Sequence, residues 1–365
     1  MTTPQLTWHS VETRPVLVPM KRPVVAKVGR FDQWPLILID LHTAEGVTGR
    51  AYIAPYLAHS MRYLIPALHD IVADRKGQPV APLDDFRGGR KSMTLIGLEG
   101  FSLIALSGLD MAAWDARAKA AEVPLAVLLG GTVGPVRAYN SNGLWLHPLE
   151  GLGAEAAALV EEGGYSAVKI RLGRGRIDDD RAAIRAVRDA CGSDINIMVD
   201  FNQGLAMDQA LILCHALDDE GLVWLEEPIA YDNLTGYAQL TRELKTPVML
   251  GENFYGPRAL WNAIEAKACN LAMPDLMRIG GVTGWMKAAA MATAVDMPMS
   301  NHLFPEFSAH MMRVTDTADW FESVDWSDPV LRNPYSIVDG CVQIPDVPGV
   351  GLEWDEDAVK RYAYE

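Results

Sequence analysis

The pattern of apolar and polar positions changes along the first third of the chain. Residues 14–19 and 36–41 form short β-like runs, whereas residues 57–73 and 103–121 have the spacing of helices. Strands followed by helices in one segment are typical of an α+β unit. We therefore predict an α+β domain over residues 1–130.

From residue 136 onward, short β-rich runs are each followed by an amphipathic helical stretch. Repeated βα units imply parallel strands, and eight of them spaced roughly 25 residues apart suit a closed α/β barrel. A Rossmann sheet is the main alternative, but no GxGxxG motif follows a strand. We predict a barrel over residues 131–325, with strands at 136–141, 167–171, 197–201, 223–226, 248–251, 271–274, 297–300 and 318–322.

The C-terminal segment lacks the alternating strand and helix pattern of the barrel. Residues 326–365 carry Pro329, Pro334, Pro345 and Pro348, and a segment so rich in proline cannot be another βα unit. We expect it to pack back across the barrel or the N-terminal domain.

Composition narrows the class of partner. The chain has 365 residues and a formal charge of −15, which argues against nucleic acid and anionic membranes, because both need a basic surface. A small molecule is the better ligand. Four scattered cysteines without a CxxC pair, together with no secretory signal and no long apolar run, indicate a cytoplasmic protein with reduced thiols.

Acidic residues fall at the ends of successive predicted strands. Asp200 ends IMVD, Glu226 ends VWLE, Glu252 follows VMLG and Asp275 follows LAMP. The carboxyl ends of barrel strands converge on one face, where crowded carboxylates need a cation between them. Single oxygen ligands that leave room for water and substrate suit Mg²⁺ better than Zn²⁺. We predict Asp200, Glu226 and Glu252 as Mg²⁺ ligands.

Each acid could instead be a helix N-cap, since Asp and Glu are favoured at such junctions. Three acids in the same phase on successive strands favour the metal site.

Lys169 and Arg171 occupy alternate positions of one strand, so both side chains point to the same side. They could stabilise the enediolate that forms when a proton beside a carboxylate is removed, or be surface cations at a strand end.

His302 lies one strand after Asp275, so the carboxylate could hydrogen-bond one ring nitrogen and leave the other as a base. Alone, such a histidine is more often a core residue. Asn202 and Glu322 also fall at strand ends and could bind substrate hydroxyl and carboxylate oxygens. Ser141, Tyr56 and Val24 complete the candidate substrate-binding residues.

Nine stretches of the sequence form a specific set: PLILIDL, GLDMAAWDA, AVKIRLG, IMVDFNQG, WLEEP, LGENFYGP, LAMPDLMRIGGVTGW, MPMSNHLFPEFSAH and PDVPGVGLEW. Through them, residues 19–362 resemble the mandelate racemase subgroup of the enolase superfamily. The resemblance implies an N-terminal capping domain on a modified (β/α)₇β barrel, with residues 19–34 as a lid over the active site. It also implies symmetric homo-oligomers, octamers among them.

The resemblance also implies roles for single residues. It implies Mg²⁺ binding by the three acids named above and an Asp-His dyad of Asp275 and His302. Glu322 matches the acid that binds the substrate carboxylate, and Asn202 the residue that meets the 2-hydroxyl. Lys169 matches the lysine that holds the carboxylate near the metal.

One position departs from the pattern. Arg171 stands where the family's KxK motif has a second lysine, the acid/base on the face opposite histidine. Guanidinium is a poor base, so dehydration of a 2,3-dihydroxy acid with one base, His302, is the leading prediction. A 2-hydroxy-acid racemase is the alternative, and a non-catalytic metal-binding barrel is the third.

The lid also suggests a substrate. Its cations, Lys21, Arg22, Lys27 and Arg30, suggest a polar, hydroxylated substrate such as an acid sugar, unless they form a solvated outer face.

Overall fold

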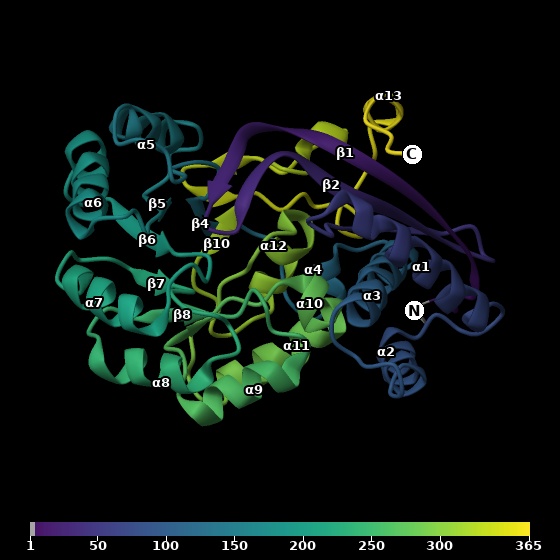
Figure 1. Cartoon of the computed structure of the whole chain (residues 1–365). Helices are drawn as coiled ribbons and strands as arrows, with labels where there is room; N and C mark the ends of the chain where they lie inside the picture. The colour runs from purple at the N-terminus through teal and green to yellow at the C-terminus, as the bar shows by residue number, and fades with distance from the viewer. Residues whose placement is uncertain (1–3) are drawn as a thin grey trace.

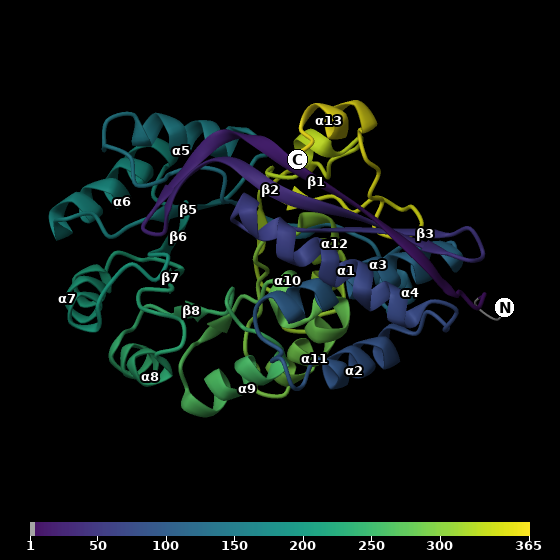
Figure 2. The ribbon, with the colours of Figure 1, turned by 45° about the vertical axis from the view of Figure 1, so that its right-hand side comes forward.

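The computed structural model describes residues 4–365 and begins with a long antiparallel hairpin (Figure 1). Strand β1 (Trp8–Ala26) pairs with β2 (Gly29–Thr43), which pairs with β3 (Thr48–Ile53). The two predicted β-runs lie inside β1 and β2, which are much longer. The hairpin therefore extends beyond the three-stranded sheet, and Figure 2 shows it arching from that sheet to the barrel.

Helices cover one face of this sheet. The central one, α3, is buried over most of its length and approaches β3 closely, since a Cβ at Gly49 would lie 2.0 Å from the carbonyl oxygen of Ala112. Glycine is required at that contact because no other residue leaves room for the helix backbone. The helices of this part are η1 (Ala58–Ser60), α1 (Met61–Arg75), α2 (Pro82–Ser92), α3 (Phe101–Ala120) and α4 (Leu125–Leu128).

The second part of the chain is the predicted parallel barrel. It closes because β10 pairs in parallel with β4. Its interior is filled by large side chains, including Tyr139, Met198 and Trp224, so it is a packed core. The strands are β4 (Val136–Asn140), β5 (Ala167–Arg171), β6 (Asn196–Asp200), β7 (Trp224–Glu226), β8 (Val248–Leu250), β9 (Leu271–Ala272) and β10 (Phe321–Ser323).

One predicted strand is not formed. Residues 297–300 contribute only single parallel bridges, from Met299 to Ala272 on one side and to Ala318 on the other. Pro298 has no N–H to donate, which explains why a ladder does not continue here. The segment still occupies a strand position between β9 and β10, so all eight positions of the barrel are filled.

Helices surround the barrel on the outside, as βα connections require (Figure 1). Most present one buried face to the strands, as the burial of Ala183, Ile184 and Val187 on α6 illustrates. These helices are α5 (Leu152–Glu161), α6 (Ile177–Cys191), α7 (Met207–Leu217), α8 (Leu234–Glu243), α9 (Pro257–Ala266), α10 (Leu276–Ile279), α11 (Gly281–Thr293) and α12 (Pro305–Arg313). None of the helices within residues 4–365 combines the length and apolarity needed to cross a membrane.

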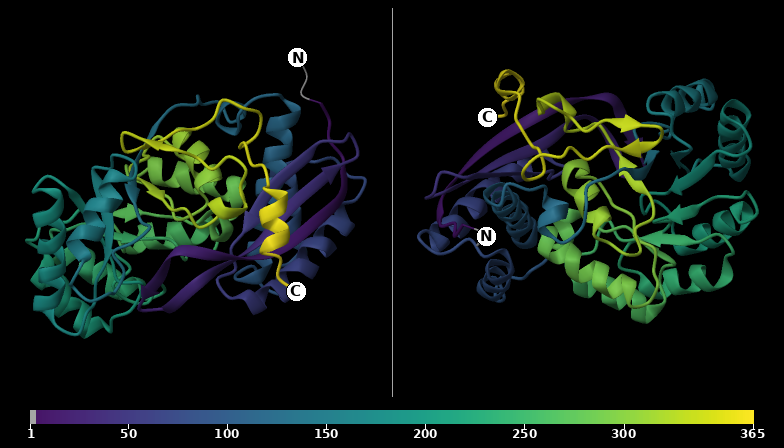
Figure 3. Two further views of the ribbon diagram at one scale, coloured as in Figure 1. Left: turned by 90° about the horizontal axis from the view of Figure 1, so that it is seen from above. Right: turned by 180° about the vertical axis from the view of Figure 1, so that it is seen from behind.

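The C-terminal segment contacts both parts of the molecule (Figure 3). Its hairpin of β11 (Ile337–Val338) and β12 (Cys341–Val342) pairs antiparallel with β4. Between η2 (Asp328–Val330) and α13 (Glu356–Arg361), the Trp354 indole donates to Asp40 of β2 over 2.8 Å. The boundaries at residues 130 and 325 stay a prediction.

A buried histidine joins this segment to the barrel. In α12, His310 accepts a hydrogen bond from the Ala126 amide over 3.1 Å and lies 3.0 Å from the Tyr335 hydroxyl. Burial lowers the pKa of His310 from 6.5 to about 3. The unfolded chain therefore binds a proton that the folded chain excludes.

We expect acid to destabilise the protein through His310. Its contribution is complete above pH 6.5 and is lost as the pH falls toward about 3, at up to about 1.4 kcal/mol per pH unit. Denaturant unfolding at several pH values should show a shallower acid slope for His310→Asn than for the wild type, because asparagine does not titrate. Parallel curves would show that His310 does not cause the slope.

Candidate active site

Three carboxylates lie at the carboxyl ends of consecutive strands. Asp200 ends β6 and is the register partner of Glu226, which ends β7. Glu252 follows β8 by two residues. Asp200 and Glu226 are buried, and the amide and side chain of Asn202 donate to Asp200 over 2.7 and 2.8 Å. The predicted strand phase therefore brings these acids to one end of the barrel.

A buried lysine sits among the acids. The Lys169 ammonium lies 2.9 Å from Glu226, 2.7 Å from Glu322 and 3.7 Å from Asp200. Burial alone would lower the pKa of Lys169, but the charges of Glu226 and Glu322 outweigh it and raise the pKa. Lys169 is thus a fixed cation beside the carboxylates.

One lysine does not neutralise the cluster. Burial and the nearby charges of Asp200, Glu322 and Glu252 raise the pKa of Glu226 to about 8, although Lys169 lowers it. The neighbouring Glu227 is also buried with a raised pKa, first from burial and then from the charge of Glu252. Excess buried negative charge of this kind accommodates a hard divalent cation, and every donor is oxygen.

The predicted ligands have other partners in this structure. The Trp224 indole donates to Glu226 over 3.1 Å, and the other Glu226 oxygen faces Lys169. Across residues 4–365, no three His, Cys, Asp or Glu side chains are already grouped at metal-binding distances. The donor chemistry therefore fits Mg²⁺, while the ligand assignment stays a prediction.

The predicted dyad is formed. His302 Nδ1 lies 2.8 Å from Asp275 Oδ2, and Nε2 lies 3.4 Å from Glu252 Oε2. Asp275 also caps α10 by accepting from the amide of Met277, so the N-cap reading and the dyad are both correct for this acid. Burial lowers the pKa of His302, but Glu252 and the Asp275 hydrogen bond dominate and raise it to about 9.

Glu322 lies opposite, in β10. One of its oxygens faces Lys169 and accepts from the Ser141 hydroxyl over 2.8 Å, and the other accepts from the Leu303 amide over 3.0 Å. Burial raises the pKa of Glu322, but Lys169 and then His302 outweigh this and lower it to about 2. Glu322 is therefore charged at neutral pH.

Arg171 is anchored by its surroundings. Its guanidinium donates to the Ser141 hydroxyl over 3.1 Å and to the Ser141 carbonyl over 3.3 Å, and it stacks on Trp145 at 4.1 Å. Its Nε lies 3.6 Å from Asp200. These contacts fix the guanidinium beside Asp200, where it can stabilise negative charge.

Six of these charged groups, Lys169, Arg171, Asp200, Glu252, His302 and Glu322, line a cavity of about 200 Å³ whose outer wall is largely apolar. The rings of Trp34, Tyr56 and Trp326 pack edge to face, with centroids 4.9 and 4.6 Å from that of Trp34. Val24 and Phe31, register partners near the tip of the hairpin, complete this wall. The predicted residues that line the cavity include Val24, Tyr56, Asn202, Lys169, Arg171, His302 and Glu322, whereas Asp275 and Ser141 do not line it.

The lid's cations do not belong to this wall. Lys21 and Arg22 pair with Glu162, and Arg30 pairs with Asp32 on the exposed face. Strand alternation separates Arg30 from Phe31, and the break in register between Pro19 and Val24 separates Lys21 and Arg22 from Val24. None of the lid's four cations lines the cavity, so the basic lid gives no support for a polar substrate; of the four, Arg30 lies on a solvated outer face as the alternative expected.

Several features of the site were not predicted. Arg278 stacks on Tyr56 at 4.8 Å and donates to the Glu252 carbonyl over 2.9 Å. Asn202, Gln203 and Glu227 have positive φ values of 46°, 60° and 39°. Such strained backbone clusters at functional sites. Glu227, in WLEEP, directly follows a predicted strand, so the pattern that identified the other acids could have identified it too. No local sequence feature indicates that Arg278 or the tryptophans belong to the site.

Two family models together match most of the chain. Residues 9–130 match the N-terminal domain of mandelate racemase and muconate lactonizing enzyme, and residues 151–358 match the enolase C-terminal domain-like model.

Curated relatives include sugar-acid enzymes. L-talarate/galactarate dehydratase of Salmonella typhimurium is 30% identical over 72% of this chain and 66% of its own length, so the match spans just under two thirds of that protein. D-galactarolactone cycloisomerase of Agrobacterium fabrum is 32% identical over 73% of this chain and 75% of its own length.

Solved structures agree over the whole fold. An enolase from alpha pretobacterium bal199 with bound magnesium is 52% identical, with a TM-score of 0.97 over 98% of this chain and 100% of its own. An enolase from Bradyrhizobium complexed with magnesium and mandelic acid is 37% identical, with a TM-score of 0.95 over 100% of both chains. This chain therefore belongs to the mandelate racemase/muconate lactonizing enzyme family of the enolase superfamily.

Proposed function

We propose that this protein is a Mg²⁺-dependent enzyme that removes the α-proton of a 2-hydroxycarboxylate through an enediolate. The observation that carries the proposal is the pairing of His302 with Asp275, across one cavity from Lys169 and beside the carboxylate cluster. A positioned base and positioned cations are what this chemistry needs. An intact dyad and acid set also disfavour a non-catalytic barrel.

The residues divide the work by position. Asp275 binds Nδ1 of His302, so in the neutral ring Nε2 would be the nitrogen that accepts the proton. Lys169 and Arg171 supply positive charge for the enediolate. The predicted ligands Asp200, Glu226 and Glu252 would hold Mg²⁺, which supplies Lewis-acid stabilisation of the same charge.

Dehydration of a sugar acid is the leading reaction. His302 takes the proton from C2, the electron pair forms the enediolate, and this expels hydroxide from C3. The imidazolium returns its proton to the hydroxide, so water leaves and the enol becomes a 2-keto acid. Relatives named as talarate/galactarate and arabinonate dehydratases support this choice.

The cavity wall favours a second candidate. Phe31, Trp34, Tyr56 and Trp326 offer aromatic surface, which suits an aryl 2-hydroxy acid as well as a sugar ring. The Bradyrhizobium structure is described as complexed with mandelic acid. An acid with no β-hydroxyl cannot lose water by this route, so proton exchange or racemisation would be the reaction.

A screen of sugar acids and aryl 2-hydroxy acids with Mg²⁺ tests the proposal. Formation of a 2-keto acid identifies a dehydratase, whereas a change in optical rotation alone identifies a racemase. Failure of every acid to exchange its α-proton with deuterated solvent would contradict proton abstraction.

Arg171→Met should separate one-base from two-base chemistry. With one base, we expect kcat to fall on the order of 10²-fold, because a charge-stabilising donor is lost, while the same enantiomer still exchanges its α-proton. Arg171→Lys restores a titratable amine for comparison. Solvent-deuterium exchange followed by NMR for both enantiomers is the measurement. Loss of exchange by only one of two active enantiomers in Arg171→Met would establish Arg171 as a base.

We also propose a homo-oligomer, an octamer by family resemblance. Exposed apolar side chains on the N-terminal part support a protein partner: Leu95 is 98% and Ile96 78% exposed, and the exposed rings of Tyr63 and Phe101 pack together. Light scattering would give the number of copies, and a monomeric mass would refute assembly.

We propose a cytoplasmic location, which the four unpaired cysteines support. Fractionation of the source cells would test it.

A further inference from the structure

The lid hairpin reaches the barrel through three separate contacts near its tip. The first is a backbone hydrogen bond from the Leu146 amide to the Val25 carbonyl, 2.9 Å long. It joins β1 to the loop after β4, although the two segments are far apart in sequence. This bond can form only while the hairpin lies against the barrel, so the Leu146 amide reports lid closure.

The second contact is ionic and lies outside the catalytic cluster. Register is lost between Pro19 and Val24 of β1, and in this bulge Lys21 and Arg22 turn toward the barrel. Lys21 lies 3.1 Å from Glu162, and Arg22 pairs with both oxygens of the same carboxylate.

Glu162 is itself tied to the barrel. It follows α5 directly, and the Asn140 side chain at the end of β4 donates to it over 3.4 Å. The bulge of the hairpin is therefore linked through one carboxylate to a fixed strand.

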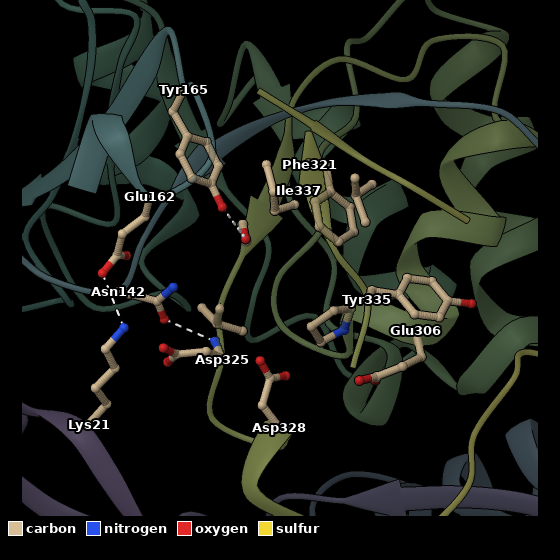
Figure 4. A pocket seen from close by; sticks show the side chains of 14 residues that line it. Lys21, Asn142, Glu162, Tyr165, Glu306, Phe321, Asp325, Asp328, Tyr335 and Ile337 are labelled. Atoms are coloured by element: carbon tan, nitrogen blue, oxygen red, sulfur yellow. Dashed lines mark hydrogen bonds and ion pairs between the residues drawn. The ribbon is translucent and has the colours of Figure 1, made fainter. Parts of the chain in front are cut away.

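The surroundings make this ion pair important for the lid. Figure 4 shows that Lys21 and Glu162 face each other at the edge of a cavity of about 250 Å³. Its other walls include the acids Glu306, Asp325 and Asp328. Negative charge along this cavity favours the two cations of the bulge, so charge attraction helps to hold the bulge against the barrel.

The third contact is steric. The stem of Lys27, at the hairpin turn, lies against Gly204 in the loop after β6. A Cβ at Gly204 would lie 2.2 Å from Lys27 Cγ and 2.5 Å from Lys27 Cβ. Gly173 contributes to the same groove, since its Cβ would lie 3.1 Å from Lys27 Cε. Any side chain at Gly204 would push the hairpin tip away.

We propose that Glu162 and Gly204 are positioning residues that hold the lid closed over the active site. Glu162 attracts the bulge through Lys21 and Arg22, and Gly204 leaves the groove that receives Lys27. Closure places Val24 and Phe31 in the cavity wall and keeps water from the reacting proton. We call these contacts of Glu162 and Gly204 with the lid the clamp. The clamp does not depend on which acid is the substrate, so it can be tested without substrate.

Hydrogen exchange at the Leu146 amide, read by mass spectrometry of the peptide that contains it, measures lid opening. For Glu162→Gln we expect exchange about two- to fivefold faster than in the wild type, the range of a partly exposed ion pair. High salt should speed the wild type toward the variant and leave the variant unchanged. For Gly204→Ala we expect exchange faster by on the order of tenfold or more, because overpacking is costly.

Matched controls separate the clamp from general loosening. Asp32→Asn removes an exposed ion pair of the same hairpin that does not touch the barrel, and Gly175→Ala adds a methyl group where a Cβ meets nothing within 4 Å. Both should exchange at the wild-type rate. Because a Cβ at Gly204 would also lie 2.9 Å from the Phe201 carbonyl oxygen, the double variant Lys27→Gly/Gly204→Ala is needed.

The double variant decides between a lid clash and a distorted loop. It should exchange no faster than Lys27→Gly alone if the methyl group acts through Lys27. Wild-type exchange in both Glu162→Gln and Gly204→Ala would overturn the proposal. So would faster exchange that appears equally in peptides remote from the lid. Once a substrate is known, both variants should raise KM more than they lower kcat.

Discussion

His302→Asn should lower kcat by about two to four orders of magnitude on any substrate, which is the usual cost of losing a general base. Asparagine is smaller and does not titrate, so the variant cannot accept the α-proton. Solvent-deuterium exchange into recovered substrate should disappear along with turnover. In the one-base reading, this loss applies to both enantiomers.

The structure supplies a control for this experiment. Asp275→Asn keeps an N-cap acceptor for the Met277 amide, so α10 should remain, but the ring of His302 loses the carboxylate that fixes its tautomer. We expect an intermediate loss of kcat in a variant that stays folded, with a lower melting temperature because a buried charged pair is broken. Exchange that persists in folded His302→Asn would show that another group, Arg171 first among them, removes the proton.

The sequence predicted the acids and the dyad because their positions follow from strand phase. Asp200 and Glu226 end adjacent strands, and Asp275 and His302 follow the next strands along. A barrel places all strand ends on one face, so local pattern is enough to bring these residues together. Their roles in binding and catalysis stay predictions.

The cavity wall could not be predicted in the same way. Trp34, Trp145 and Trp326 come from three distant segments, and only tertiary packing brings their rings together. Arg278 lies in a short buried helix whose direction no periodic pattern reveals. The sequence likewise left open whether the lid's cations face the substrate, and only the bulge in β1 shows that Lys21 and Arg22 reach Glu162 on the barrel instead.

Glu226→Gln should weaken Mg²⁺ binding at least about 100-fold, because loss of even an outer partner of a metal ligand costs about 10- to 100-fold. The neutral amide removes one of the charges that hold a hard cation. In the wild type, Mg²⁺ should raise the melting temperature, because a ligand that binds only the folded state stabilises it by mass action. The variant should lose most of this rise, and calorimetric titration should give the affinities.

Glu226→Gln should affect stability much less when no metal is bound. Burial and neighbouring acids raise the pKa of Glu226 to about 8, so its charge is unfavourable in the empty cluster. Replacing it with glutamine should therefore cost little stability in chelator, where Lys169 keeps Glu322 as a partner. Glu306→Gln is the matched control, since Glu306 is equally buried but binds Tyr52 outside the cluster. It should keep the full response to Mg²⁺, and an equal response in Glu226→Gln would refute the ligand assignment.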